Sequence, residues 1–227
     1  PHLPDDEFEP SRVGVEQSLR GLEDEPRQKV MQELKARTFP TPWGLSNEGS
    51  LDTIVTLQAA AVREHYRRAV RPNGTILAVA GYVEPAQLID CVGKLFGDWS
   101  PLPDPVIPTG PVGAKLEHIP HESTQTQIGV AYDSVPYSHP DYYAAWAAVN
   151  VLSGGMSARL FTEVREKRGL CYSVYATTTT LKDQARVLAY AGTTTERAQE
   201  TLDVLLGELI RLKDGIAEDE LTRCRAR

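Results

Sequence analysis

The sequence predicts an α+β fold built from tandem homologous units, each an antiparallel or mixed sheet covered by helices on one face. Three observations support this class. Segments with helical periodicity alternate with segments of strand periodicity, prolines crowd residues 100–117, and one strand-plus-glycine pattern occurs twice. The pattern at residues 76–81 (Ile-Leu-Ala-Val-Ala-Gly) returns at residues 187–192 (Val-Leu-Ala-Tyr-Ala-Gly), and an Ala-Gln pair follows each copy.

The first unit is assigned to residues 1–99, as the C-terminal half of an α+β unit. Acidic residues precede the first helix, where they suit the positive end of the helix dipole. A short and nearly continuous apolar run at residues 75–82 predicts a buried strand. Helices are expected over residues 5–21, 25–38, 50–70 and 84–96.

A proline-rich linker is predicted over residues 100–117, because prolines at this density favour a stiff extended chain. The second unit then covers residues 118–227. Its strands are expected over residues 126–132, 172–177 and 186–193, and its helices over residues 139–152, 157–169 and 196–213.

The composition is that of a globular protein, with 41% hydrophobic and 24% charged residues. The net charge of −7 argues against a nucleic-acid partner. The three cysteines are widely spaced, so neither a zinc ribbon nor a disulfide framework is indicated. No apolar run reaches the roughly 18 residues that a membrane span needs. We therefore expect no nucleic acid and no membrane span.

The most informative stretch begins with the Gly154-Gly155 turn and continues as a short helix and a strand. Gly169 is placed to end the helix in a left-handed conformation. From Tyr172 the period is two, which predicts Tyr172, Val174 and Ala176 on one face. Arg165 and Tyr172 flank the glycine turn, so we expect their side chains to converge. Both are hydrogen-bond donors, which suits a carbonyl oxygen or carboxylate.

The same two residues also fit a plainer interpretation. Arg165 would then be a solvated charge on a helix surface, and Tyr172 an ordinary strand aromatic. A third interpretation is an anion-binding module at Gly154-Gly155 and the helix start at Ser157. The sequence lacks the Lys-Ser/Thr of a phosphate-binding loop.

The segment from Gly154 to Tyr175 reads Gly-Gly-Met-Ser-Ala-Arg-Leu-Phe-Thr-Glu-Val-Arg-Glu-Lys-Arg-Gly-Leu-Cys-Tyr-Ser-Val-Tyr. It closely resembles the Arg/Tyr segment of the pitrilysin-like (M16) zinc metallopeptidases, a family that includes bacterial processing-peptidase-like members and the core proteins of the respiratory bc1 complex. The resemblance implies that Arg165 and Tyr172 grip the substrate carbonyl and stabilise the tetrahedral intermediate. It also implies that Gly154 and Gly155 contribute to substrate binding.

The resemblance further implies a zinc ion held by a His-x-x-Glu-His helix and a downstream glutamate. This sequence contains no such motif. The nearest string, His118-Ile-Pro-His121-Glu122, has the wrong order and a proline inside it. Glu16 is similar in placement to the family's third zinc ligand, but alone it would not hold zinc, since catalytic zinc takes three protein ligands. We expect zinc in the complete enzyme and none bound by this chain alone.

We therefore expect both units to be incomplete, and the chain to be part of a zinc-dependent endopeptidase acting on peptides or small unfolded polypeptides. The zinc motif would lie upstream or on a partner chain, in a homodimer or heterodimer. The alternative is a non-catalytic structural or peptide-binding subunit of the same fold. The compartment stays open between bacterial cytoplasm and periplasm.

Overall fold

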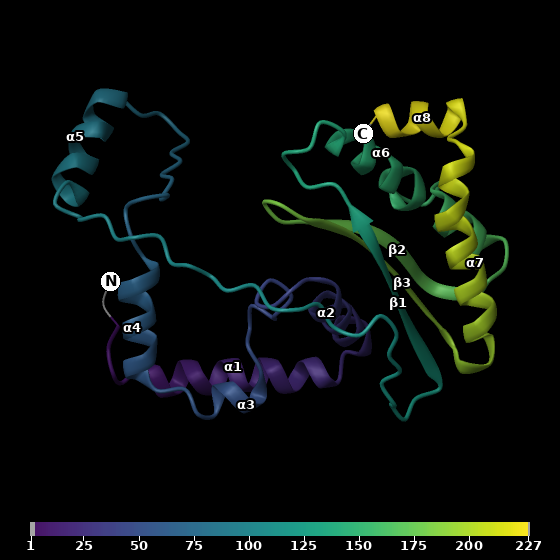
Figure 1. Ribbon diagram of the computed structural model, residues 1–227, viewed down its shortest axis with the longest axis horizontal. Helices are drawn as coiled ribbons and strands as arrows, with labels where there is room; N and C mark the ends of the chain where they lie inside the picture. Colours follow the sequence, from purple (N-terminus) through teal and green to yellow (C-terminus); the bar gives the residue numbers. More distant parts are fainter. Residues whose placement is uncertain (1–2, 227) are drawn as a thin grey trace. The chain divides into compact units, whose positions relative to one another are not determined.

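The computed structural model describes residues 3–226 of the chain (Figure 1). Its contacts group the chain into two compact units. One comprises the residues up to Leu19 together with Gly49–Pro108, and the other comprises Arg20–Glu48 and the residues from Thr109 onward. The fold is α+β, as the sequence predicts, and the strands lie in the second unit.

The first unit is helical. Its short helix α3 begins with a reciprocal cap, in which the Ser50 side chain accepts from the Thr53 backbone N–H and Thr53 reaches back to Ser50. Near the start of α1, the guanidinium of Arg63 on α4 donates to Asp5 at 2.7 Å. The helices are α1 (Phe8–Glu23), α3 (Leu51–Ile54), α4 (Ala59–Ala69) and α5 (Pro85–Phe96), and α1 continues into the second unit.

The strand predicted at residues 75–82 is not formed, and this expectation is wrong. The segment has no strand pairing, and its side chains are exposed, with Ile76 at 90%. A strand exists only where a neighbouring strand accepts its backbone hydrogen bonds. The three described strands pair only with one another, and residues 75–82 pair with none of them. The two copies of the strand-plus-glycine pattern therefore differ, because residues 187–192 lie in a buried strand.

The second unit is organised around a three-stranded antiparallel sheet in the order β1-β3-β2. The strands are β1 (Gln125–Ser134), β2 (Cys171–Thr180) and β3 (Ala185–Thr194). The central strand β3 pairs on both sides, with Ala189 opposite Val130 on β1 and Ala176 on β2. Because β3 is covered on both edges and both faces, most of its side chains are buried.

One face of the sheet carries the main core. Val187, Ala189 and Ala191 of β3 point to this face, in the alternation that a strand imposes. The helices α6 (Tyr142–Ser153) and α7 (Ala198–Ile210) pack on it and contribute Leu152 and Leu205, both fully buried (Figure 1). Short 3₁₀ turns flank α7 at Thr195–Arg197 and Arg211–Asp214, and α8 (Glu218–Arg225) follows.

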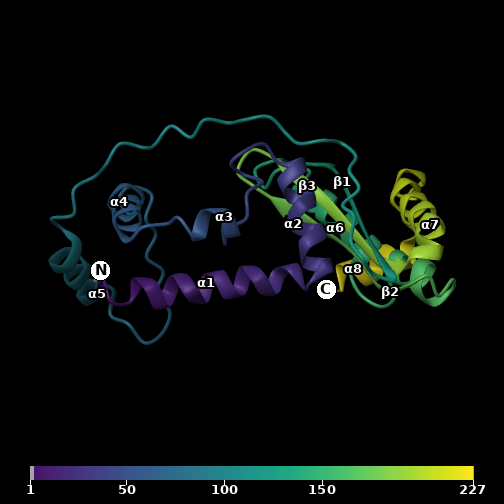
Figure 2. The same ribbon diagram turned by 90° about the horizontal axis from the view of Figure 1, so that it is seen from below.

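The opposite face of the sheet is partly covered by α2 (Pro26–Thr38) (Figure 2). This helix comes close enough that a side chain at Gly129 would meet Leu34 at 3.3 Å and Val30 at 3.4 Å. Arg186 of β3 points the same way and donates to the Thr38 backbone oxygen at 3.1 Å. The sheet of this unit thus carries α6 and α7 on one face and α2, over β1 and β3, on the other. Among the described residues, no helix combines the length and apolarity that crossing a membrane requires.

Candidate functional site

The site predicted from the sequence lies between α6 and β2, where the chain makes a glycine turn and a short irregular helix. Gly155 adopts a φ of 139°, which only glycine takes without strain. The following helix contains a π-helical turn over Phe161–Glu166, in which the Lys167 N–H donates to the Thr162 oxygen at 2.9 Å. The regular 3.6-residue helix expected from the sequence is therefore widened here. Such π turns occur frequently at functional sites.

Buried contacts on both sides fix this helix. Leu160 and Val164 have no exposed surface and join the main core under α6 and α7. Gly169 takes a φ of 56°, and its N–H donates to the Arg165 oxygen at 2.9 Å. The buried Thr193 hydroxyl of β3 donates to the Leu170 oxygen at 2.7 Å. The turn between the helix and β2 is thus held to the central strand.

A β-bulge turns Tyr172 out of the sheet. Cys171 pairs with Thr193 and Ser173 pairs with Gly192, so Tyr172 is the extra residue on β2. Its side chain is 85% exposed, whereas Cys171 beside it is buried. The expectation that Tyr172 shares a face with Val174 and Ala176 is therefore wrong, because regular alternation fails at the inserted residue.

Arg165 and Tyr172 lie together, as the sequence predicts. The guanidinium carbon of Arg165 lies 5.0 Å from the centroid of the Tyr172 ring and 4.7 Å from the centroid of the Phe161 ring. These distances are typical of cation–π contacts. The Arg165 side chain is 36% exposed, and its Nε lies 3.7 Å from a carboxylate oxygen of Glu166. A charged donor and a phenolic donor therefore stand side by side at the protein surface.

Two titratable groups close to this pair have shifted pKa values. Burial raises the pKa of the Cys171 thiol, and the charge of Arg165 opposes that shift. Hydrogen bonds from Lys167 and Arg168 lower the pKa of the Glu163 carboxyl. Glu163 is thus engaged by two neighbouring cations on its own helix, and Arg165 stacks on aromatic rings.

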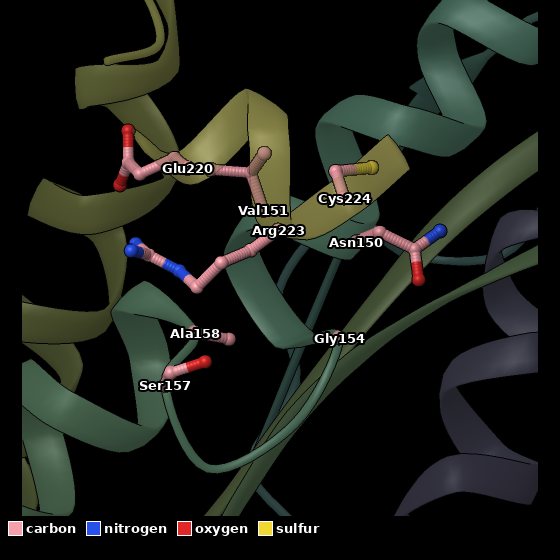
Figure 3. Close-up of a pocket in the computed structure, with 8 residues that line it drawn as sticks. All are labelled: Asn150, Val151, Gly154, Ser157, Ala158, Glu220, Arg223 and Cys224. Atoms are coloured by element: carbon pink, nitrogen blue, oxygen red, sulfur yellow. The ribbon is translucent and has the colours of Figure 1, made fainter. Parts of the chain in front are cut away.

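The glycine turn itself borders a small pocket (Figure 3). The pocket lies between the Gly154 turn and α8, and its volume of about 20 Å³ is enough for one water molecule. The lining residues come from α6, the turn and α8, and Arg165 and Tyr172 are not among them: Asn150, Val151, Gly154, Ser157, Ala158, Glu220, Arg223 and Cys224.

The predicted zinc ligand Glu16 lies on α1, with its side chain 15% exposed and a carboxylate oxygen 3.5 Å from an Arg12 nitrogen. Within residues 3–226, no three His, Cys, Asp or Glu side chains are grouped so that they could hold a metal ion. His118 and His121 are exposed and lie in a segment that forms neither helix nor strand. The described donor set therefore does not fit a zinc ion without ligands from elsewhere. The role of Glu16 stays a prediction.

Phe161 is the site residue that the sequence analysis missed as such. Phe161 is half buried in the structure, and its ring stacks with the guanidinium of Arg165. The available signal was the four-residue spacing between an aromatic and a cation on one helix, since residues at i and i+4 are neighbours on a helix surface.

The antiparallel sheet with its helical layer, and the exposed Arg/Tyr pair, agree with the resemblance to the M16 peptidases that the sequence shows. Residues 56–227 match the family model described as the peptidase M16 inactive domain. The chain belongs to the peptidase M16 family, and the resemblance seen in the sequence is confirmed.

Relatives of this chain include bacterial proteins named as zinc proteases. The zinc protease SCO5738 of Streptomyces coelicolor is 30% identical over 185 residues, which cover 77% of this chain and 40% of that protein. The zinc protease YmxG of Bacillus subtilis is 27% identical over 225 residues, which cover 96% of this chain and 54% of that protein. The chain thus spans about half the length of these relatives.

Solved structures share the fold. A peptidase M16 inactive domain from Pseudomonas fluorescens superposes with a TM-score of 0.88 at 23% identity, covering 98% of this chain and 55% of that one. A chain of complex III2 from Candida albicans superposes with a TM-score of 0.80 at 18% identity, covering 95% of this chain and 54% of that one. At these identities, the likeness concerns the fold.

Proposed function

We propose that this chain contributes substrate binding and oxyanion stabilisation to a zinc-dependent endopeptidase that acts on peptides or small unfolded polypeptides. The observation that carries the proposal is the stacked pair of Arg165 and Tyr172, placed at the surface by a π-helical turn and a β-bulge. Gly154 and Gly155 shape the turn before it and are proposed to border the bound peptide.

The chemistry of the pair fits the carbonyl of a peptide bond under attack. Negative charge develops on that oxygen in the tetrahedral intermediate, and donors already in place stabilise it without reorganisation. The Tyr172 hydroxyl supplies one O–H, and the Arg165 guanidinium supplies N–H groups and a positive charge. Stacking against Tyr172 and Phe161 restricts the guanidinium before substrate arrives.

The zinc site is proposed to lie outside these residues, upstream in a longer chain or on a partner chain in a homodimer or heterodimer. This is supported by the names of the relatives and by their greater length. A zinc ion bound at that site would supply an activated water of lowered pKa and a Lewis acid for the carbonyl. Glu16 is proposed to join that site, which requires its carboxylate to leave Arg12.

The test is cleavage of a quenched fluorescent peptide by the natural-length protein with whatever chain co-purifies. Tyr172→Phe removes only the hydroxyl, so kcat/KM is expected to fall about 100- to 1000-fold. Tyr175→Phe is the matched control, because Tyr175 lies on the same strand and packs against Tyr190 at 5.2 Å. Wild-type cleavage should stop with a zinc chelator. An equal fall of kcat/KM in both variants, or no fall in either, contradicts the role of Tyr172.

A second candidate is a non-catalytic structural or peptide-binding subunit with this fold. The description of the matched family model as an inactive domain favours it. In that case the intact assembly binds peptide through Arg165 and Tyr172 without cleaving it, and its metal content is zero. Isothermal titration with an uncleaved peptide, alongside metal analysis of the same sample, distinguishes the two candidates.

A further inference from the structure

Arg165 lies against two aromatic rings. Its guanidinium carbon lies 4.7 Å from the Phe161 ring centroid and 5.0 Å from the Tyr172 ring centroid. Tyr172 is highly exposed and stands on a bulge, so it offers little support of its own. Phe161 is half buried, and its neighbour Leu160 is anchored in the core. Of the two rings, Phe161 is therefore the fixed one.

The backbone explains why Phe161 reaches Arg165. The two residues stand four positions apart within one π-helical turn, which places both on the same side of the helix. On this turn Glu166 offers a competing partner, with its carboxylate 3.7 Å from the Arg165 Nε. A long arginine side chain has many rotamers, and exposed ion pairs hold such side chains weakly. The ring of Phe161 supplies a flat surface that selects one orientation.

We propose that Phe161 is a positioning residue, whose ring holds the Arg165 guanidinium beside Tyr172 for the carbonyl oxygen of a peptide substrate. The inference deepens the proposed function and rests on it. Phe161 acts through Arg165 and has no donor with which to contact substrate oxygen itself. Its contribution is to fix where the charged donor stands before substrate binds.

The first test needs no catalysis. In the natural-length protein with ¹⁵N-labelled arginine, ring currents from Phe161 and Tyr172 are expected to shift the Arg165 Nε–H signal away from that of a solvated arginine. Phe161→Leu should move this signal toward the solvated position, and Phe161→Tyr should preserve it. Arg186, whose guanidinium lies 5.2 Å from the Phe39 ring, supplies a reference signal that should stay unchanged.

The second test measures peptide cleavage in the same assembly. Phe161→Leu is expected to lower kcat/KM about 3- to 10-fold, the size of a partly exposed cation–π contact, and Phe161→Tyr should restore it. If Phe161→Leu fails to fold, as judged by circular dichroism, Phe161→Met replaces it, because the flexible methionine side chain fills irregular space and also lacks the ring.

The outcomes separate this inference from the proposed function. An Arg165 signal that does not respond to the loss of the Phe161 ring overturns the positioning role, even if Tyr172→Phe still abolishes cleavage. A signal that responds, together with unchanged cleavage in Arg165→Ala, overturns the proposed function instead. Loss of cleavage in Phe161→Tyr as severe as in Phe161→Leu also contradicts a role carried by the ring.

Discussion

The pair Arg159–Glu220 makes a sharp prediction about stability. Arg159 lies at the start of the helix that carries Arg165, here termed the site helix. It donates from Nε and Nη2 to the two carboxylate oxygens of Glu220 at 2.7 and 2.6 Å. Both side chains are largely buried, at 11% and 17% exposed. Arg159 also donates to the Gly215 oxygen, and Glu220 accepts from the Ala217 N–H that begins α8. The pair therefore ties the site helix to α8 and the loop before it.

The contribution of this pair to stability follows from the pKa of the Glu220 carboxyl. The hydrogen bonds from Arg159 lower the pKa of Glu220 from 4.5 to about 2. That difference corresponds to about 3 kcal/mol of folding free energy. Because the folded-state pKa is lowered, the stabilisation is fully present above pH 4.5. It is lost as the pH falls from about 4.5 toward 2, where the folded protein also binds the proton.

Glu220→Gln keeps the shape of the side chain and removes its charge. We expect the free energy of unfolding at pH 7, measured by urea denaturation and circular dichroism, to fall by about 3 kcal/mol. Near pH 2 wild type and variant should converge. Asp219→Asn is the control on the same helix: its partner Arg223 is exposed, so its effect should be much smaller. The reasoning is refuted if Glu220→Gln leaves the free energy of unfolding unchanged at pH 7, or lowers it by the same amount at every pH down to 2.

Three further predictions concern the core, the second helical layer and the cysteines. Leu205→Ala empties a fully buried position and should cost about 2–5 kcal/mol in urea denaturation, and a loss below 1 kcal/mol would show that the site collapses freely. Gly129→Val places methyl groups against Val30 and Leu34, so it should cost about 1–3 kcal/mol and speed amide exchange in α2; unchanged exchange would mean that α2 does not pack on this face. Cys91 is exposed and should react rapidly with a thiol reagent, whereas Cys171 is buried with a raised pKa and should react only after unfolding, as peptide mass spectrometry can follow; equal rates would contradict the burial.

Periodicity predicted most elements of the chain because their side chains face a core within the same unit. β3 and α7 are examples: alternating residues of β3 meet Leu205 and Leu209 of α7 in one cluster, so the pattern in the sequence reflects contacts that exist. Residues 75–82 carry the same apolar pattern, but they do not form a strand. Strand formation depends on backbone partners from other segments, and a sequence window contains no information about them.

The site was predicted in part, for a related reason. The glycines and the Arg/Tyr spacing indicated a turn that brings Arg165 and Tyr172 together, and the structure has that turn. The π-helical turn and the β-bulge were missed, because each is a shift of register by one residue. Sequence periodicity assumes a constant register, so it placed Tyr172 on the same face as Val174 and Ala176.

These two irregularities have a common consequence for function. One lies just before Gly169 and the other just after it, so a change of register occurs on each side of the same turn. Leu160, Val164 and Leu170 on the flanking backbone are buried and keep that backbone fixed. Arg165 directly follows the buried Val164 and Tyr172 lies two residues after the buried Leu170, and the two side chains meet beside the turn. The proposed peptidase role requires donors that are in place before an oxyanion develops, and the position of this pair beside a buried backbone suits that role.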